Sequence, residues 1–131
     1  MVTLDSNVAI YAFSEVGAKA AIAADVIGKA DFISVQVLNE FAAVARVKQR
    51  RSWSEIAEKV ADLRSAVPRV LPIAPEANAE ALHIAERYRL SFYDALMLAV
   101  ALQGGARTFY SEDMQHGLLI DDTLRIVDPF R

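Results

Sequence analysis

The chain has 131 residues, which suits one compact domain with a hydrophobic core and is too short for two. Its hydrophobic fraction of 54%, rich in alanine, favours packed helices, and the absence of cysteine excludes disulfides, thiolate catalysis and cysteine-ligated zinc. The net charge of −3 lacks the basic footprint of a general DNA-binding protein, so any contact with nucleic acid has to come from a local patch.

Short apolar runs alternate with helical patterns in the first half of the chain. We predict strands at Val2–Leu4 and Phe32–Val35, and helices at Val8–Phe13, Ala18–Lys29, Gln36–Gln49 and Ser52–Ser65. Apolar residues of the third helix recur at helical spacing. The last helix opens on Ser52 and Glu55, three residues apart, as in a capping box.

The second half continues the alternation. We predict strands at Arg69–Leu71, Arg107–Tyr110 and Leu124–Val127, helices at Glu76–Arg89 and Phe92–Leu102, and a short turn or helix at Ser111–His116. The helix at 92–102 is apolar on every face, which predicts that it is buried on several sides, and Gly104-Gly105 ends it. Strands that alternate with helices predict one α/β domain over residues 1–131, with a parallel sheet covered on both faces.

Four acidic residues stand near the places where predicted strands end. Asp5 follows the first strand, and Asp113 follows the strand at 107–110. Asp94 lies at the start of the buried helix, and Glu40 lies one turn inside the helix that follows residues 32–35. Because function gathers at the carboxyl ends of the strands in an open parallel sheet, we expect these side chains to share one edge.

Each acid also has a purely structural interpretation. Asp5 can be a helix N-cap, and Asp113 can cap a short helix. Asp94 follows Ser91 with the spacing of a capping box, and Glu40 can be an ordinary solvated residue. The structural interpretation therefore needs four independent coincidences at one edge of one sheet.

Four carboxylates that lie together repel one another unless a cation is present. Mg²⁺ and Mn²⁺ prefer such hard oxygen ligands, together with water and substrate phosphate. A metal held in this way can lower the pKa of a bound water and orient it for in-line attack, which is the chemistry of phosphodiester hydrolysis.

Four motifs in collinear order resemble PIN-domain proteins, and among these the VapC-type ribonuclease toxins of bacterial toxin–antitoxin pairs. The motifs are Leu4-Asp5-Ser6-Asn7, Val37-Leu-Asn-Glu40-Phe, Ser91-Phe-Tyr-Asp94-Ala-Leu and Tyr110-Ser-Glu-Asp113-Met. The resemblance implies a three-layer α/β/α fold with a central, mostly parallel sheet. It also implies an Mg²⁺- or Mn²⁺-dependent endoribonuclease, a homodimer and an inhibitory antitoxin protein.

The resemblance further implies roles for single residues. The metal-binding, catalytic acids of the family correspond to Asp5, Glu40, Asp94 and Asp113. Ser111 stands where threonine is commoner and keeps the hydroxyl oxygen as a supporting group. Asn7 replaces a second acid that some relatives carry, so we count it as a supporting residue and not as a metal ligand.

A basic stretch follows the third predicted helix. It comprises Arg46, Lys48, Arg50 and Arg51, with Trp53 close behind. These cations can bind RNA phosphates, with the indole stacking on a base, or they can simply favour a helix C-terminus. Both interpretations of the charges stand, whereas we expect Trp53 in the core.

The sequence supports other functions less well. Of the two histidines, we interpret His83 as structural and assign no role to His116. A phosphatase with a nucleophilic first-strand aspartate requires a second aspartate where Asn7 stands. A PIN-like module that binds RNA or protein without cutting is the alternative function. Because no apolar run reaches the roughly 18 residues of a membrane span and no signal peptide is recognisable, we expect a cytoplasmic protein.

Overall fold

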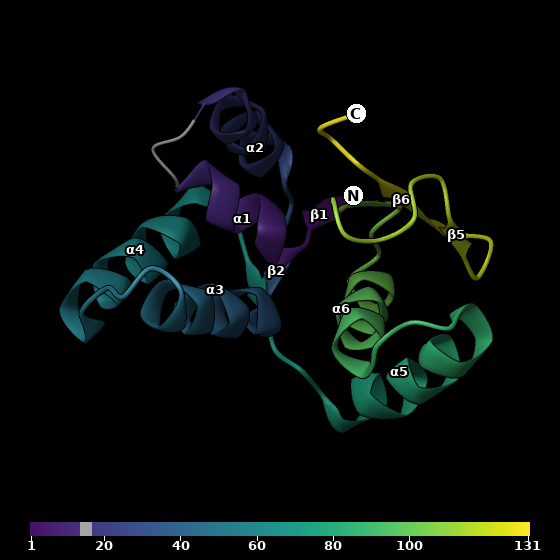
Figure 1. The fold of residues 1–131 in the computed structure, drawn as a ribbon. Coiled ribbons are helices and arrows are strands. Elements are labelled where there is room, and N and C mark those ends of the chain that lie inside the picture. Colours follow the sequence, from purple (N-terminus) through teal and green to yellow (C-terminus); the bar gives the residue numbers. More distant parts are fainter. Residues whose placement is uncertain (14–16) are drawn as a thin grey trace.

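Six helices and six strands make up the computed structural model over residues 1–13 and 17–131, the part of the chain that it describes (Figure 1). The strands are β1 (Val2–Leu4), β2 (Ile33–Ser34), β3 (Val70–Leu71), β4 (Thr108–Tyr110), β5 (Leu119–Ile120) and β6 (Leu124–Val127). The helices are α1 (Ser6–Ala12), α2 (Gly17–Lys29), α3 (Val35–Val47), α4 (Trp53–Ala66), α5 (Pro75–Tyr88) and α6 (Phe92–Gln103). Within those residues, no helix combines the length and the apolar character that a membrane crossing requires.

The strands form a mostly parallel central layer. One sheet has the order β1-β4-β6-β5, in which β1, β4 and β6 are parallel and β5 is antiparallel to β6. A second sheet pairs β2 with β3 in parallel. It lies beside β1, because the Asp31 N–H donates to the Val2 carbonyl at 2.8 Å and the Thr3 hydroxyl donates to the Phe32 carbonyl at 2.6 Å.

Helices cover both faces of this layer. Figure 1 shows α1 to α4 on one side of β1 and β2, and α5 and α6 on the other. All residues from Ala95 to Ala101 of α6 are buried, so this helix has no solvent-facing side over two turns, as its apolar sequence predicted. The three-layer α/β/α fold with a mostly parallel sheet is thereby confirmed.

Gly104 has a packing role besides ending α6. A Cβ atom at this position would lie 2.5 Å from Cζ of Phe32 and 2.6 Å from Cδ1 of Leu71. Real Cβ atoms do not approach neighbours that closely, so a larger residue at this position would require the side chains of Phe32 and Leu71 to move.

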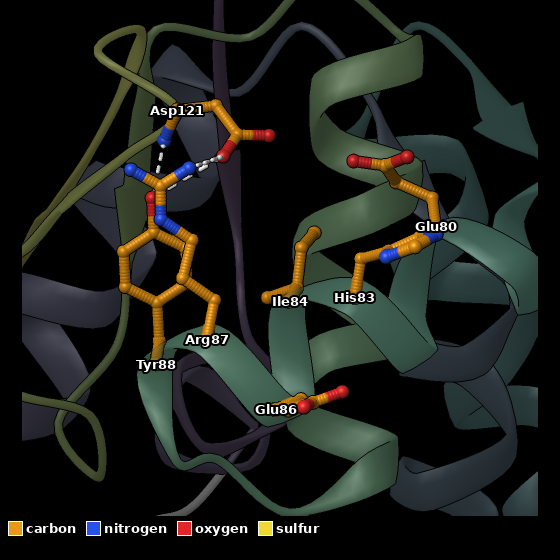
Figure 2. A pocket seen from close by; sticks show the side chains of 7 residues that line it. All are labelled: Glu80, His83, Ile84, Glu86, Arg87, Tyr88 and Asp121. Carbon is orange, nitrogen blue, oxygen red and sulfur yellow. Dashed lines mark hydrogen bonds and ion pairs between the residues drawn. The ribbon is translucent and has the colours of Figure 1, made fainter.

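The hairpin of β5 and β6 was not predicted from the sequence. Asp121 and Asp122 turn the chain between the two strands, with φ values of 49° and 56°. The Tyr88 hydroxyl accepts a hydrogen bond from the Asp121 N–H at 2.9 Å and donates to its carboxylate at 3.2 Å, which fastens the hairpin to the end of α5. A cavity of about 500 Å³ lies between these elements; Figure 2 shows Glu80, His83 and Arg87 among its lining.

Candidate active site

Asp5 joins the end of β1 to the start of α1. Its Oδ1 accepts a hydrogen bond from the Ser6 N–H at 2.7 Å, so it is the N-cap of α1. Its own N–H donates to the Tyr110 carbonyl at 2.8 Å, which places it beside the carboxyl end of β4. Only 3% of Asp5 is exposed. Its structural role as a cap therefore coincides with a buried position at the edge where function was expected.

The segment after β4 brings a second acid to Asp5. The Ser111 hydroxyl donates to Oδ2 of Asp5 at 2.8 Å and accepts from the Asp113 N–H at 3.2 Å. The side-chain amide of Asn7 lies 3.1 Å from Oδ2 of Asp113 and 3.3 Å from Oδ2 of Asp5. Residues from the two ends of the chain thus form one hydrogen-bonded group. This segment is a turn and not a helix, so the interpretation of Asp113 as the cap of a short helix was wrong.

Glu40 reaches the same group from α3. The Ser6 hydroxyl donates to Oε1 of Glu40 at 2.7 Å and also lies 3.4 Å from Oδ1 of Asp5. The Gln36 amide, one turn earlier on α3, donates to Oε2 of Glu40 at 3.1 Å. Neither partner was predicted from the sequence. Ser6 follows Asp5 directly, where a serine is also an ordinary helix-start residue, so nothing in the pattern distinguished it.

Asp94 lies in the first turn of α6. Its N–H donates to the Ser91 hydroxyl at 3.3 Å, so the predicted serine cap is formed. Burial raises the pKa of Asp94, and the charges of Glu40 and Asp113 raise it further against the lowering effect of the hydrogen bond with Ser91. Asp94 is therefore near enough to the other acids to feel their charge.

The strongest electrostatic perturbation is at Asp5. Burial raises the pKa of Asp5 from 3.8 to about 6, and the charges of Asp94 and Glu40 act in the same direction. The hydrogen bonds from Ser111 and Ser6 oppose this rise without cancelling it. A buried carboxyl group among like charges is a feature of functional sites, because a folded protein gains no stability from it.

The donor set suits a hard divalent cation, because four carboxylates supply oxygen ligands and negative charge. Within residues 1–13 and 17–131, no three acidic or histidine side chains converge closely enough to hold an ion as they stand. Hydroxyl and amide donors of Ser6, Asn7 and Ser111 occupy the carboxylate oxygens instead. These neutral donors stabilise the carboxylates without cancelling their negative charge, so the residues fit a divalent cation by chemistry. Binding such an ion requires the carboxylates to turn toward it.

The basic stretch divides into two parts. Arg46 lies with its guanidinium 4.5 Å from the ring centre of Trp53 and donates to the Arg51 carbonyl at 3.1 Å. Arg51 pairs with Glu55 at 3.6 Å. Arg50 is exposed, with a φ of 55°. These three arginines form the corner between α3 and α4.

Lys48 differs from the arginines, because it lies in the wall of a cavity that also includes Ser6, Asn7 and Asp113. Of the basic stretch, it is the residue that lines the same cavity as Asp113. The expectation that Trp53 lies in the core was wrong. Its side chain is 64% exposed, because it begins α4 at the corner and stacks with Arg46.

The two histidines lie outside the acidic group. The Nδ1 atom of His116 accepts a hydrogen bond from the Asp128 N–H at 3.0 Å, which ties the turn after β4 to the segment after β6. His83 is exposed on α5 and lines the cavity in Figure 2.

Comparison with known proteins identifies the family. The PIN domain model matches residues 2–117. Among solved structures, a toxin–antitoxin complex from Klebsiella pneumoniae is 19% identical, covers 98% of each chain and has a TM-score of 0.74. A second similar structure is VapBC2 from Rickettsia felis, bound to a DNA fragment from its promoter. The matched chain is 16% identical, the match covers 98% of this chain and 100% of that one, and the TM-score is 0.69.

VapC20 of Mycobacterium tuberculosis, described as a sarcin–ricin-loop-cleaving toxin, is 21% identical. It covers 86% of this chain and 90% of its own, with a TM-score of 0.68. No curated protein sequence matches significantly. The fold, the ordered acidic motifs and the family match over residues 2–117 agree, and the chain belongs to the PIN domain family.

Proposed function

We propose that the protein is a divalent-metal-dependent endoribonuclease that hydrolyses RNA phosphodiester bonds by in-line attack of water. The observation that carries this proposal is the joining of three acids from distant segments, Asp5, Glu40 and Asp113, through hydroxyl and amide donors. Asp94 lies within electrostatic range of the same group. Membership of the PIN family and the fold shared with VapC20, described as a sarcin–ricin-loop-cleaving toxin, support the choice of RNA as substrate.

Each group has a part in this proposal. The ion, Mg²⁺ or Mn²⁺, would be held by Asp5, Glu40, Asp94 and Asp113. It would supply Lewis acidity and offset the negative charge of the phosphate. Ser111 and Asn7 keep the carboxylates of Asp5 and Asp113 together while the substrate enters and leaves.

The basic groups complete the proposal. Arg46, Lys48, Arg50 and Arg51 attract the phosphates of the strand. Because the proposed substrate is RNA, we also propose that the protein acts in the cytoplasm.

The test is incubation of the purified protein with defined RNAs, in Mg²⁺ or Mn²⁺ and in EDTA. We expect cleavage with either metal, none in EDTA, and products that carry a 5′-phosphate, because the attacking group is water. Cleavage that persists in EDTA and leaves 2′,3′-cyclic ends would contradict the mechanism. RNA binding without cleavage under any metal would favour the silent PIN-like module instead.

We also propose that the protein is a toxin that forms a homodimer and is inhibited by a small antitoxin. The similar folds of the Klebsiella toxin–antitoxin complex and of Rickettsia VapBC2 support this proposal. An apolar hollow of about 280 Å³ offers a place for an amphipathic antitoxin helix; its lining includes Phe13, Ile27 and Ala66.

Expression of the chain alone should slow bacterial growth, and co-expression with the product of the neighbouring gene should restore it. The purified chain should have the mass of a dimer in solution by light scattering. A stable monomer that neither slows growth nor binds the neighbouring product would count against the toxin assignment while leaving the nuclease activity open to its own test.

A further inference from the structure

We infer that the groove between α1 and α3 is a subsite for one nucleotide of the RNA strand, adjacent to the acidic residues; this inference rests on the proposed ribonuclease function. The groove is the cavity lined at one end by Ser6, Asn7 and Asp113, and its volume is about 430 Å³. That volume lies within the range of pockets that bind small molecules. It is continuous with the acidic site, because Ser6 and Asn7 belong to both.

The spacing of residues on α3 builds one wall of the groove. Glu40, Val44 and Lys48 succeed one another at intervals of four residues, so they lie on one face of the helix. Lys48 continues this face as the C-cap of α3, with its N–H bonded to the Val44 carbonyl at 2.9 Å. About 12 Å of helix separates Glu40 from Lys48. This face of α3 therefore runs from Glu40 in the acidic site to Val44 and Lys48, which line the groove.

The opposite wall comes from α1, where Asn7 and Tyr11 are also four residues apart, with Ile10 beside them. Tyr11 is held in place: its ring packs edge-on against Phe130 at 5.0 Å, and the Lys19 ammonium lies 4.9 Å from its centre. The half-buried Ile10 and Tyr11 therefore give the groove a firm apolar side opposite Val44.

The groove offers apolar side chains along its length and a cation at its end. A nucleotide, which has a flat base and a charged phosphate, matches this arrangement better than a purely apolar or purely anionic ligand does. Its base can lie between the apolar side chains of Ile10 and Val44, where every base offers a flat face. Its phosphate can reach the Lys48 ammonium, which is exposed at the far end. Gln49, also in the wall, carries an amide that both donates and accepts hydrogen bonds and can read a base edge. A strand whose scissile phosphate lies at the acids thus continues toward Lys48.

The decisive variant is Val44→Trp, which fills the groove, and its matched control is Ala43→Trp, which puts the same bulk on the neighbouring, exposed position of α3. Lys48→Ala, at an exposed position, tests the charged end separately and keeps the inference falsifiable if Val44→Trp fails to fold. The readouts are kcat and KM on a short single-stranded RNA in Mg²⁺, the nucleotide preference on either side of the cut, and binding of a fluorescent RNA in EDTA.

We expect Val44→Trp to raise KM at least about tenfold, to weaken RNA binding equally and to change the nucleotide preference at one position next to the cut. Ala43→Trp should match wild type. Lys48→Ala should raise KM. It should also make the slope of log binding constant against log salt concentration less steep by about 0.7, the value of one phosphate contact on a single strand.

Unchanged KM, preference and binding in Val44→Trp and Lys48→Ala would overturn the inference. The inference would also be overturned if Val44→Trp weakened the binding of an inhibitory protein and left RNA cleavage and RNA binding unchanged. Failure of wild type to cleave any RNA would refute the proposed nuclease, whereas the binding comparison would still decide whether the groove holds a nucleotide.

Discussion

Asp94→Asn is expected to lower the rate of RNA cleavage at least about a hundredfold, because even the outer partners of metal ligands are worth ten- to a hundredfold. The same change should leave the metal-free protein at pH 7 as stable as wild type or more stable. Burial and the charges of Glu40 and Asp113 raise the pKa of Asp94, so the ionised carboxylate destabilises the fold, and asparagine removes that charge. Asparagine also keeps the backbone N–H that bonds to Ser91.

Thermal melts with EDTA and with Mg²⁺ measure the effect on stability. Mg²⁺ at a hundred times its dissociation constant should stabilise wild type by about 2.7 kcal/mol and the variant much less. Asp62→Asn, at an exposed position on α4, is the control that should behave like wild type in both assays. An Asp94→Asn protein that is destabilised, active and equally responsive to Mg²⁺ would remove Asp94 from the site and leave it as a helix cap.

The metal-free protein should become less stable as the pH rises from about 4 to about 7. The pKa of Asp5 is about 6 in the folded chain against 3.8 for an ordinary aspartate, so the folded state holds a proton that the unfolded state has already released. The penalty is absent below pH 3.8, grows through the interval, and reaches about 3 kcal/mol above pH 6. Neutralisation of the site by Mg²⁺ should reverse the loss.

Urea unfolding in EDTA at about pH 4.5 and about pH 7.5 isolates this contribution when wild type is compared with Asp5→Asn. The variant lacks the ionisable group, so its free energy of unfolding should change less between the two pH values. Since the side chain of asparagine retains one carbonyl oxygen to accept the Ser6 N–H, the cap of α1 can persist. Equal pH dependence in the two proteins would show that Asp5 is not the group responsible.

Local sequence rules predicted the parts of the fold that depend on neighbours in the chain. The capping box of Ser52 and Glu55 starts α4 with both of its hydrogen bonds, and Ser91 caps α6. Acids that follow strands were expected at one sheet edge, and Asp5 and Asp113 do lie together there, because parallel strands end on the same side.

Features that depend on packing between distant segments were not predictable in this way. Strand β5 has two residues, too few to show the alternation of apolar and polar residues that indicates a strand. It meets β6 because the chain turns at Asp121 and Asp122, both of which have left-handed backbone conformations. Trp53 was expected in the core by its apolar character, yet the corner between α3 and α4 turns it outward over Arg46. Ser6 is a partner of Glu40 because α1 and α3 lie side by side, which no local pattern in the sequence indicates.

The hydrogen bonds between Asp5 and Ser111 and between Asn7 and Asp113 each join residues 106 positions apart. Contacts of such long range form late, because the chain has to close a large loop before they contribute stability. Synthesis proceeds from the N-terminus, so Asp5 and Asn7 emerge first and have no partners until Ser111 and Asp113 have left the ribosome. The acidic site is thus built only after that point, and no nascent fragment that ends earlier can assemble it.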